Sequence, residues 1–514
     1  MKKLCIILSF IAFRAVSYAQ LPDFYFTYNY PGVRICGGIA LETEDGNYLA
    51  SAFEYGPEWF TYEDDNTSPA KILKLSATGE LLGEMLFGEE GRRSTIVGLF
   101  PDPDQKDLYL AVGKIHDNEL HCDHLLAYKF DNNLQPVWQK EIMAEEVANC
   151  FFFHGRSFMD AQGDIAYMTL PYEVLTQPLF HPQTYFKISS DDGTLLAVHE
   201  GEQPMSSYLV LGSFFEFQDG SGDYGHAGKF HSSNAIVRMN RDFEIIGEHP
   251  LPSKIPSPYG ENGYELYFDF VSMDYPTVLS QPDSSLVIIW ESHENFMLPK
   301  YRTDMSMLKT DYDGNVTASL LVGFVNDTTE LDPDIRGVDR SGDMLYFCHG
   351  SYIVINDEYH LLEGTNLITV TKTDSDLNLI WQRYCRLDMN CQPHCITATK
   401  DGGCLITGSV FNEEISNMLA FKVLADGTVG CQETGIQIRP YLFYPNPAQN
   451  ELHLQYSPDV TPKQIELYDL QGRLMQTQSK NLESLNMAGL PAGTYTMRVM
   501  LEDGKVFSDK VVKE

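Results

Sequence analysis

One pattern recurs seven times between residues 70 and 430 and sets the length of the folding unit. Each copy is an apolar stretch that carries a single basic residue, then a polar turn, then a second apolar stretch. The basic residues are Lys74, Lys129, Lys187, Arg238, Lys309, Lys372 and Lys422. They span 348 residues in six intervals, a mean of 58 residues. A unit of this size cannot bury an apolar face alone, so neighbouring copies must pack against one another.

A second turn-containing stretch separates successive copies of the pattern. It is clearest at residues 40–53, 336–350 and 395–410, and its turns carry pairs such as Asp45-Gly46 and Asp401-Gly402. Asp-Gly favours a β-hairpin because glycine accepts a positive φ. Two hairpins per copy give four strands, and a closed ring of four-stranded sheets is a β-propeller. The sequence therefore predicts an all-β fold with a seven-bladed β-propeller over residues 20–439.

Two further signals bear on the number of blades and on how the ring closes. The interval from Arg238 to Lys309 is 71 residues long and has room for an extra hairpin, so six to eight blades are compatible with the spacing. Residues 23–30 read DFYFTYNY, an aromatic-rich strand ahead of the first complete repeat. We expect this strand to join the last blade and close the ring.

The basic residue of each repeat is predicted to be structural. Its neighbours are usually apolar, as Leu73 and Leu75 are beside Lys74. In a strand these two neighbours point to one face and pack between blades, while the lysine stem lies along the other face. A position filled in all seven copies fits a repeated contact better than seven active sites.

The first nineteen residues have the features of a secretory signal peptide. Lys2 and Lys3 precede an apolar run at residues 4–13, and the small residues Ser17 and Ala19 stand where cleavage occurs. No other stretch is predicted to span a membrane. Cleavage changes the formal charge from −36 to −39, because three basic residues leave. Such a charge argues against nucleic acid as a partner.

The chain changes pattern after residue 439. Residues 440–514 lack the repeat and contain short alternating strands: YPNPAQNELHLQY, then QIELYDLQGRLMQTQ, then LNMAGLPAGTYTMRVML, then GKVFSDKVVKE. These motifs, in this order, resemble the type A C-terminal sorting domain of the Bacteroidetes type IX secretion system. The matching positions include Pro445, Asn446, Pro447, Tyr468, Gly472, Leu490, Pro491, Gly493, Tyr495 and Lys510.

This resemblance implies a small immunoglobulin-like β-sandwich over residues 440–514 and a route of export. The route it implies runs through the periplasm, with recognition by the type IX machinery, removal of the tail by its sortase, and delivery to the outer cell surface or the medium. The resemblance implies nothing about activity, because cargo of this kind includes proteases, adhesins, glycosidases and binding proteins.

One group of metal-binding side chains is His121-Cys122-Asp123-His124. Because strand residues alternate, His121 and Asp123 are expected on one face, and Cys122 and His124 on the other. One site could use only half of the group, so no metal ligand is assigned. Residues 311–315 resemble the start of a Ca²⁺ loop, but the glutamate expected farther along is missing. The sequence thus predicts no cofactor and leaves Ca²⁺ open.

Cysteines and catalytic motifs give little support for chemistry. Nine cysteines remain after cleavage, an odd number and too few for a disulfide framework. Cys385, Cys391, His394, Cys395 and Cys404 lie close together, and in an exported chain a disulfide or inert thiols are favoured over zinc. No Gly-x-Ser-x-Gly, His-Glu-x-x-His or phosphate-binding loop occurs, so no catalytic residue is predicted.

Aromatic residues in predicted loops are the candidate ligand contacts. Trp59 and Tyr62 lie in one such segment, and Tyr208 and Tyr224 bound another. Loops gather at the faces of a propeller, where aromatic rings stack on sugars or anchor peptides; the alternative is that they fill loop cores. We expect a non-catalytic module that binds an extracellular glycan, peptide or protein. An extracellular hydrolase or lyase with its site in the propeller funnel is one alternative, and a structural surface-layer component is another.

Overall fold

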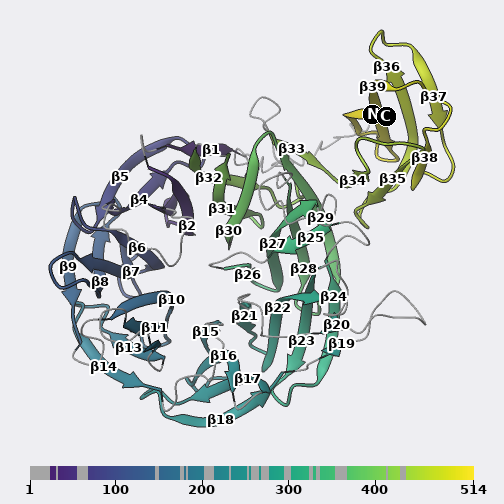
Figure 1. Cartoon of the computed structure of the whole chain (residues 1–514). Helices are drawn as coiled ribbons and strands as arrows, with labels where there is room; N and C mark the ends of the chain where they lie inside the picture. Colours follow the sequence, from purple (N-terminus) through teal and green to yellow (C-terminus); the bar gives the residue numbers. More distant parts are fainter. Residues whose placement is uncertain are drawn as a thin grey trace, which may run out of the picture.

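Every regular element in the described part of the chain is a β-strand, as the repeat predicted. The computed structural model describes residues 24–29, 33–54, 68–144, 150–173, 179–180, 183–201, 213–230, 233–251, 254–255, 266–267, 277–293, 303–322, 328–331, 336–353, 367–412, 415–428 and 436–514. The described residues up to 439 form a ring of antiparallel sheets, and those after it form a separate β-sandwich beside it (Figure 1). The all-β fold, a propeller followed by a small sandwich, is confirmed.

The first four sheets of the ring follow one another along the chain, and each is named here as a blade, with its strands given from the inside of the ring outwards. Blade 1 contains β2 (Ile35–Glu42), β3 (Tyr48–Glu54), β4 (Ala70–Leu75) and β5 (Leu81–Phe87). Blade 2 contains β6 (Ser94–Pro101), β7 (Leu108–Asp117), β8 (Cys122–Asp131) and β9 (Pro136–Ile142). Blade 3 contains β10 (Phe151–Met159), β11 (Ile165–Glu173), β13 (Thr184–Ile188) and β14 (Leu195–Glu200), with β12 (Leu179–Phe180) paired to β11. Blade 4 contains β15 (Phe214–Glu216), β16 (Tyr224–Phe230), β17 (Ser233–Met239) and β18 (Ile245–Pro250).

Three further sheets of the ring occur among the described residues. Blade 5 contains β21 (Thr277–Ser280), β22 (Ser285–His293), β23 (Thr303–Asp311) and β24 (Val316–Leu321), extended by β19 (Lys254–Ile255) and β20 (Leu266–Tyr267). Blade 6 contains β26 (Val338–Ser341), β27 (Met344–Ile353), β28 (Leu367–Asp374) and β29 (Leu379–Leu387), with β25 (Thr328–Leu331) on β27 and β33 (Ile436–Arg439) on β29. Blade 7 contains β30 (Asn390–Ala398), β31 (Cys404–Phe411), β32 (Ser416–Val423) and β1 (Tyr25–Tyr28).

Blade 7 closes the ring with strands from both ends of it. Its outermost strand is β1, which pairs antiparallel with β32 in the register Tyr25↔Phe421 to Tyr28↔Met418. Phe24, just ahead of β1, is buried against Tyr48 of blade 1. The expected closing strand is therefore present, and Figure 1 shows β1 and β32 side by side.

Apolar clusters fill the junctions between neighbouring blades. Leu73 and Leu75 of blade 1 pack with Leu405 and Met418 of blade 7. Ile72, on the other face of the same strand, packs with blade 2. Equivalent clusters join each further pair of consecutive blades in the described residues. Because both faces of each sheet are covered, the third strands are buried along most of their length.

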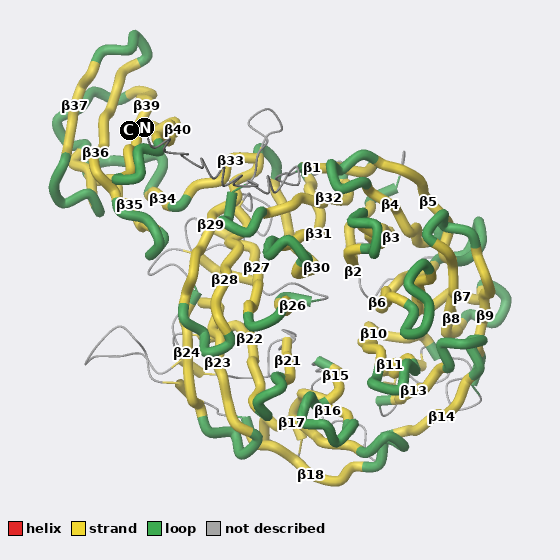
Figure 2. Tube along the Cα trace, turned by 180° about the vertical axis from the view of Figure 1, so that it is seen from behind, coloured by secondary structure: helices red, strands yellow, loops and turns green. Residues whose placement is uncertain are grey.

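The two rims of the ring differ. One rim, here called the hairpin rim, carries the turns between the first and second strands and between the third and fourth strands of each blade (Figure 2). These are short turns closed by backbone hydrogen bonds, as at residues 43–47 and 76–80. The opposite rim, here called the connection rim, carries the links between second and third strands and those between blades.

The sandwich consists of two sheets. One contains β34 (Tyr441–Tyr444), β35 (Glu451–Tyr456) and β38 (Ser484–Asn486). The other contains β37 (Leu474–Gln478), β36 (Pro462–Asp469), β39 (Gly493–Leu501) and β40 (Val506–Lys513). Side chains from both sheets form one core, including Leu452, Ile465 and Val499. The sandwich contacts blade 6, where Arg383 bonds both carboxylate oxygens of Asp459 at 2.9 and 2.7 Å.

Candidate functional site

The repeated basic residues lie in the third strand of each blade and point to the hairpin rim. Six of the seven contact a carboxylate in the first turn of their own blade. These ion pairs are Lys74–Asp45 (3.1 Å), Lys129–Asp102 (2.5 Å), Lys187–Asp160 (3.2 Å), Arg238–Asp219 (2.8 Å), Lys309–Asp283 (2.8 Å) and Lys422–Asp401 (2.9 Å). Some also reach the next blade, as Lys74 does to Asn132 Oδ1 at 2.7 Å. The structural role predicted for these residues is confirmed.

In blade 6 the repeated basic residue, Lys372, makes a different contact. The ammonium group of Lys372 donates to the carbonyl oxygen of Gly402 in blade 7 at 2.9 Å and lies 5.0 Å from the ring centre of Tyr346. Burial lowers the pKa of Lys372, and the nearby acidic groups offset that effect only in part. This lysine therefore ties blade 6 to blade 7 through a backbone carbonyl.

The described cysteines are buried thiols that form no disulfide with one another. Burial raises the pKa of the Cys385 thiol well above its usual range and that of Cys404 to about 12. A thiol with so high a pKa is a poor nucleophile. Of the two readings open from the sequence, the geometry supports inert thiols here, and His394 instead bonds Ser409 at 3.2 Å.

A mixed group of metal-binding side chains lies on the connection rim of blade 2. Asp117 ends β7, Cys122 and His124 begin β8, and Glu141 lies near the end of β9. Asp117 pairs with Cys122 across the strands, and Glu141 pairs with Leu126. Residues that pair across two strands lie on the same face of the sheet, and so do residues two positions apart in one strand. All four side chains therefore lie on the same face, which is the face towards blade 1.

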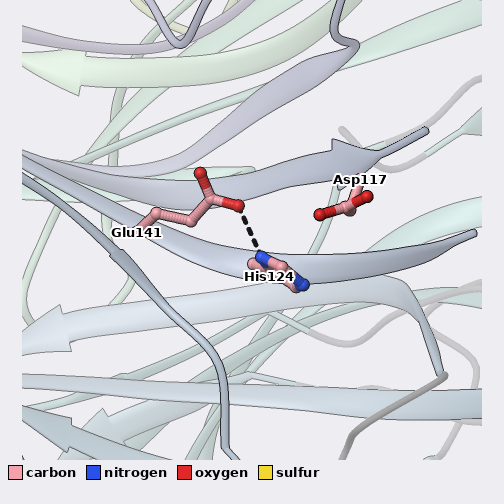
Figure 3. A group of neighbouring side chains, drawn as sticks. All are labelled: Asp117, His124 and Glu141. Carbon is pink, nitrogen blue, oxygen red and sulfur yellow. Dashed lines mark hydrogen bonds and ion pairs between the residues drawn. The ribbon is translucent and has the colours of Figure 1, made fainter. Parts of the chain in front are cut away.

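Distances within this group are short. Ligand atoms of Asp117, His124 and Glu141 all lie within 4.8 Å of one another. Figure 3 shows Glu141 and Asp117 on opposite sides of the imidazole ring of His124. The Nδ1 atom of that ring lies 2.5 Å from Glu141 Oε1, and its Nε2 atom lies 3.5 Å from Cys122 Sγ. We name these four residues the rim cluster.

Groups outside the rim cluster form hydrogen bonds with its two carboxylates. Arg92 donates to both carboxylate oxygens of Glu141, at 2.8 and 2.7 Å, and these bonds hold the pKa of Glu141 below its usual range. Asp117 accepts backbone hydrogen bonds from Glu119 and Leu120, both at 2.8 Å.

The other face of the same strands carries a separate buried group. Asp123 contacts Lys114 at 2.9 Å and His116 at 3.0 Å, and it accepts from the backbone of Phe152 in blade 3. Burial opposes the ionisation of Asp123, but its basic neighbours outweigh burial and lower its pKa. Alternation therefore divides the four-residue motif as the sequence predicted, while His121 lies in the turn with a φ of 51°.

Other predicted site residues fall in different places. Trp59, Tyr62 and Tyr208 lie outside the described residues. Tyr224 is not a loop residue: it begins β16, is fully buried, and donates to Asp160 Oδ2 at 2.6 Å. It packs in the core between blades 3 and 4 and cannot reach a ligand at the surface. Asp311 accepts the hydrogen bonds that close its own hairpin turn, two of them from Asn315.

The tail motifs lie where the sandwich needs them. Asn446 accepts from the backbone of Val512 at 2.8 Å and donates to the carbonyl of Lys510 at 3.2 Å, which ties the opening motif to the last strand. Gly472 has a φ of 76° in the β36–β37 turn. Tyr495 donates to the carbonyl of Pro491 at 2.7 Å. The remaining motif positions, Pro445, Pro447, Tyr468, Leu490, Gly493 and Lys510, all lie within this sandwich and its turns.

Comparison with protein families gives one match, to the secretion system C-terminal sorting domain, over residues 442–514. The tail is a type IX secretion sorting domain. The protein is thus cargo of that machinery and is exported to the cell surface or secreted. Among the described residues there is no helix long and apolar enough to cross a membrane.

The ring is similar to solved propeller structures at low identity. One is a catalytically inactive virginiamycin B lyase from Staphylococcus aureus with quinupristin (10% identity, 78% of this chain and 100% of that chain, TM-score 0.39). Others are the polysaccharide lyase Uly1 (9%, 80% and 94%, 0.44) and an α-L-arabinofuranosidase from Fusarium graminearum (10%, 79% and 98%, 0.37). At these TM-scores the similarity carries no statement of substrate or reaction. The search of curated proteins gave no match.

Proposed function

We propose that this type IX cargo is an extracellular, non-catalytic binding protein whose propeller presents a glycan, peptide or protein ligand site on its connection rim. The difference between the two rims carries this proposal. On the hairpin rim, short turns are fixed by ion pairs, as Lys422 fixes Asp401. On the connection rim, strands are joined by segments of very different length, since β7 and β8 are separated by residues 118–121 and β27 and β28 by residues 354–366.

A rigid ring with variable connections on one side suits recognition. Loops held by a fixed scaffold can change in sequence and length without loss of the fold, and binding residues concentrate there. The interior supports binding over covalent catalysis, because basic residues such as Lys129 and Lys422 are engaged in ion pairs and the Cys385 and Cys404 thiols have raised pKa values. We infer that the sorting domain is removed by the sortase once the propeller reaches the surface.

One observation favours hydrolysis or elimination as a second candidate. Glu54 ends β3 at the connection rim, and burial raises its pKa although nearby Ser68 and Arg93 act in the opposite direction. A carboxyl with a raised pKa can serve as a general acid. This residue gives the enzyme alternative a named position to test.

The deciding experiment is binding of the purified chain, residues 20–514, to an array of glycans and host proteins, with and without Ca²⁺. We expect saturable binding of a ligand that mass spectrometry finds chemically unchanged after incubation. Turnover of the ligand that is abolished by Glu54→Gln would overturn the proposal in favour of the enzyme. Binding of the chain only to itself would instead favour a structural part of the surface layer.

A further inference from the structure

We propose that Cys122, His124 and Asp117 of the rim cluster bind a transition-metal ion of the Zn²⁺ type on the connection rim of blade 2. This site does not depend on the proposed function, since the ion is held by side chains of the ring itself.

The separation of the sulfur and nitrogen atoms fits two ligands of one ion. Cys122 Sγ and His124 Nε2 are 3.5 Å apart. Zinc binds thiolate sulfur at about 2.3 Å and imidazole nitrogen at about 2.0–2.1 Å. Two such ligands at a tetrahedral angle are therefore about 3.5 Å apart. A carboxylate oxygen of Asp117 lies within 4.8 Å of one ring nitrogen of His124. Asp117 also pairs with Cys122 across the strands and lies on the side of the imidazole away from Glu141 (Figure 3), so we take it as the third ligand.

The neighbours of His124 fix the orientation of its ring and leave the Nε2 atom able to bind an ion. Glu141 bonds Nδ1 at 2.5 Å, and Arg92 holds Glu141 in place through two bonds. When the Nδ1–H group donates a hydrogen bond to a carboxylate, Nε2 carries the lone pair and the ring is fixed in orientation. Glu141 thereby acts as a positioning residue and is not itself a ligand in this arrangement.

The charge of the ligands and their exposure to solvent suit a divalent ion that binds one thiolate. A Cys122 thiolate and the Asp117 carboxylate together balance a charge of +2, while Arg92 already neutralises Glu141. Binding displaces the thiol proton to solvent. A thiolate and an imidazole select Zn²⁺ over Ca²⁺ or Mg²⁺, which prefer oxygen. Cys122 and His124 are buried, whereas Glu141 is exposed and Asp117 is partly exposed, so the ion enters from the carboxylate side.

Three protein ligands leave a fourth position open to water or to a donor atom from a bound partner. The same four side chains can also serve as a hydrogen-bonded cluster that only joins blades 1 and 2, and the experiment separates the two roles.

The test titrates Co²⁺, and in parallel Zn²⁺, into the reduced, metal-free chain of residues 20–514. We expect one Co²⁺ per chain with a thiolate-to-cobalt charge-transfer band in the near ultraviolet, displaced by Zn²⁺ and not by Ca²⁺. Cys122→Ser should abolish the band, and Glu141→Gln should weaken binding about 10- to 100-fold while the band remains. Cys348→Ser and His116→Gln, which change a distant thiol and the opposite face of the sheet, are the controls.

A second measurement does not depend on any variant folding. X-ray absorption at the zinc edge of the wild-type protein loaded with one equivalent should show one sulfur neighbour with nitrogen and oxygen neighbours. Absence of the cobalt band, a band that survives in Cys122→Ser, or a zinc shell without sulfur would each overturn the proposal. Any of these results would leave the binding assay on the array unaffected, so the two proposals fail separately.

Discussion

At the scale of single residues, two buried histidines make the ring sensitive to acid. His226 in β16 lies in contact with Tyr185, whose hydroxyl is 2.8 Å from its Nδ1 atom, and burial lowers the pKa of His226 to about 3. Burial likewise lowers the pKa of His349 in β27 to about 4. Both side chains are fully enclosed, so the folded protein keeps them neutral.

The pH dependence of stability follows from these two pKa values. An unfolded histidine takes up a proton below about pH 6.5, whereas these two histidines stay neutral in the folded ring. Their contribution to the free energy of unfolding is therefore complete above that pH and falls as the pH drops towards about 4. Between pH 7 and pH 5 we expect each histidine to lower the free energy of unfolding by about 2 kcal/mol. Urea denaturation at pH 7, 6 and 5 measures this slope. His226→Gln should flatten it, and the exposed His453→Gln should not; equal slopes in all three proteins would contradict the assignment.

At the scale of the element, the first turn of six blades on the hairpin rim is fixed by the basic residue of the third strand. In blade 7, Lys422 is fully enclosed and donates to Thr399 Oγ1 at 2.8 Å and to Asp401 Oδ1 at 2.9 Å. The turn thus receives an ion pair and a hydrogen bond from the third strand of its own blade.

Removal of this cation leaves the turn carboxylate without its partner. We expect Lys422→Met to lower the free energy of unfolding by about 3 kcal/mol, because breaking one side of a buried pair costs more than the pair contributes. Lys400→Met is the matched control, since Lys400 is mostly exposed and pairs with Glu44 at 3.3 Å; its effect should stay below about 0.5 kcal/mol. Urea midpoints of the two variants measure the difference, and comparable losses in both would show that burial of Lys422 is not what matters.

The sequence predicts these elements well because they depend on local pattern. Strand alternation and Asp-Gly turns lead to the hairpins, and repetition of one basic residue leads to its structural role. The rim cluster could not be predicted from strand alternation alone. Alternation places Cys122 and His124 on one face, but Asp117 and Glu141 join them only through the register between strands, which sequence spacing does not fix. Tyr224 was misplaced because a turn-rich stretch precedes it, although its own strand is buried by blade 3.

At the scale of the whole molecule, the ring depends on one short strand from its beginning. β1 supplies the outer edge of blade 7, and Phe24 fills space beside Gly79 of blade 1. Without them the edge of β32 is open and part of the junction between blades 7 and 1 is exposed.

Deletion of residues 20–29 from the mature chain should therefore lower the thermal midpoint and promote aggregation. Near-ultraviolet circular dichroism and light scattering on heating measure both effects. The comparison is a chain that ends at residue 439, which keeps β1 and the strands of the ring. A deletion variant that melts like the full mature chain would show that β1 is dispensable for closure.

Pairing of the first strand of the ring with one of its last strands also determines when the ring can close during export. Tyr25 pairs with Phe421, so the ring remains an open arc until almost all of its length has entered the compartment where it folds. The sorting domain begins at residue 442, directly behind the last strands of the ring. A chain that ends before β32 lacks both the partner of its first strand and the sorting domain. Because the sorting domain follows the ring in the chain, any polypeptide that carries it has already been synthesised through every strand of the ring, including the one that pairs with β1.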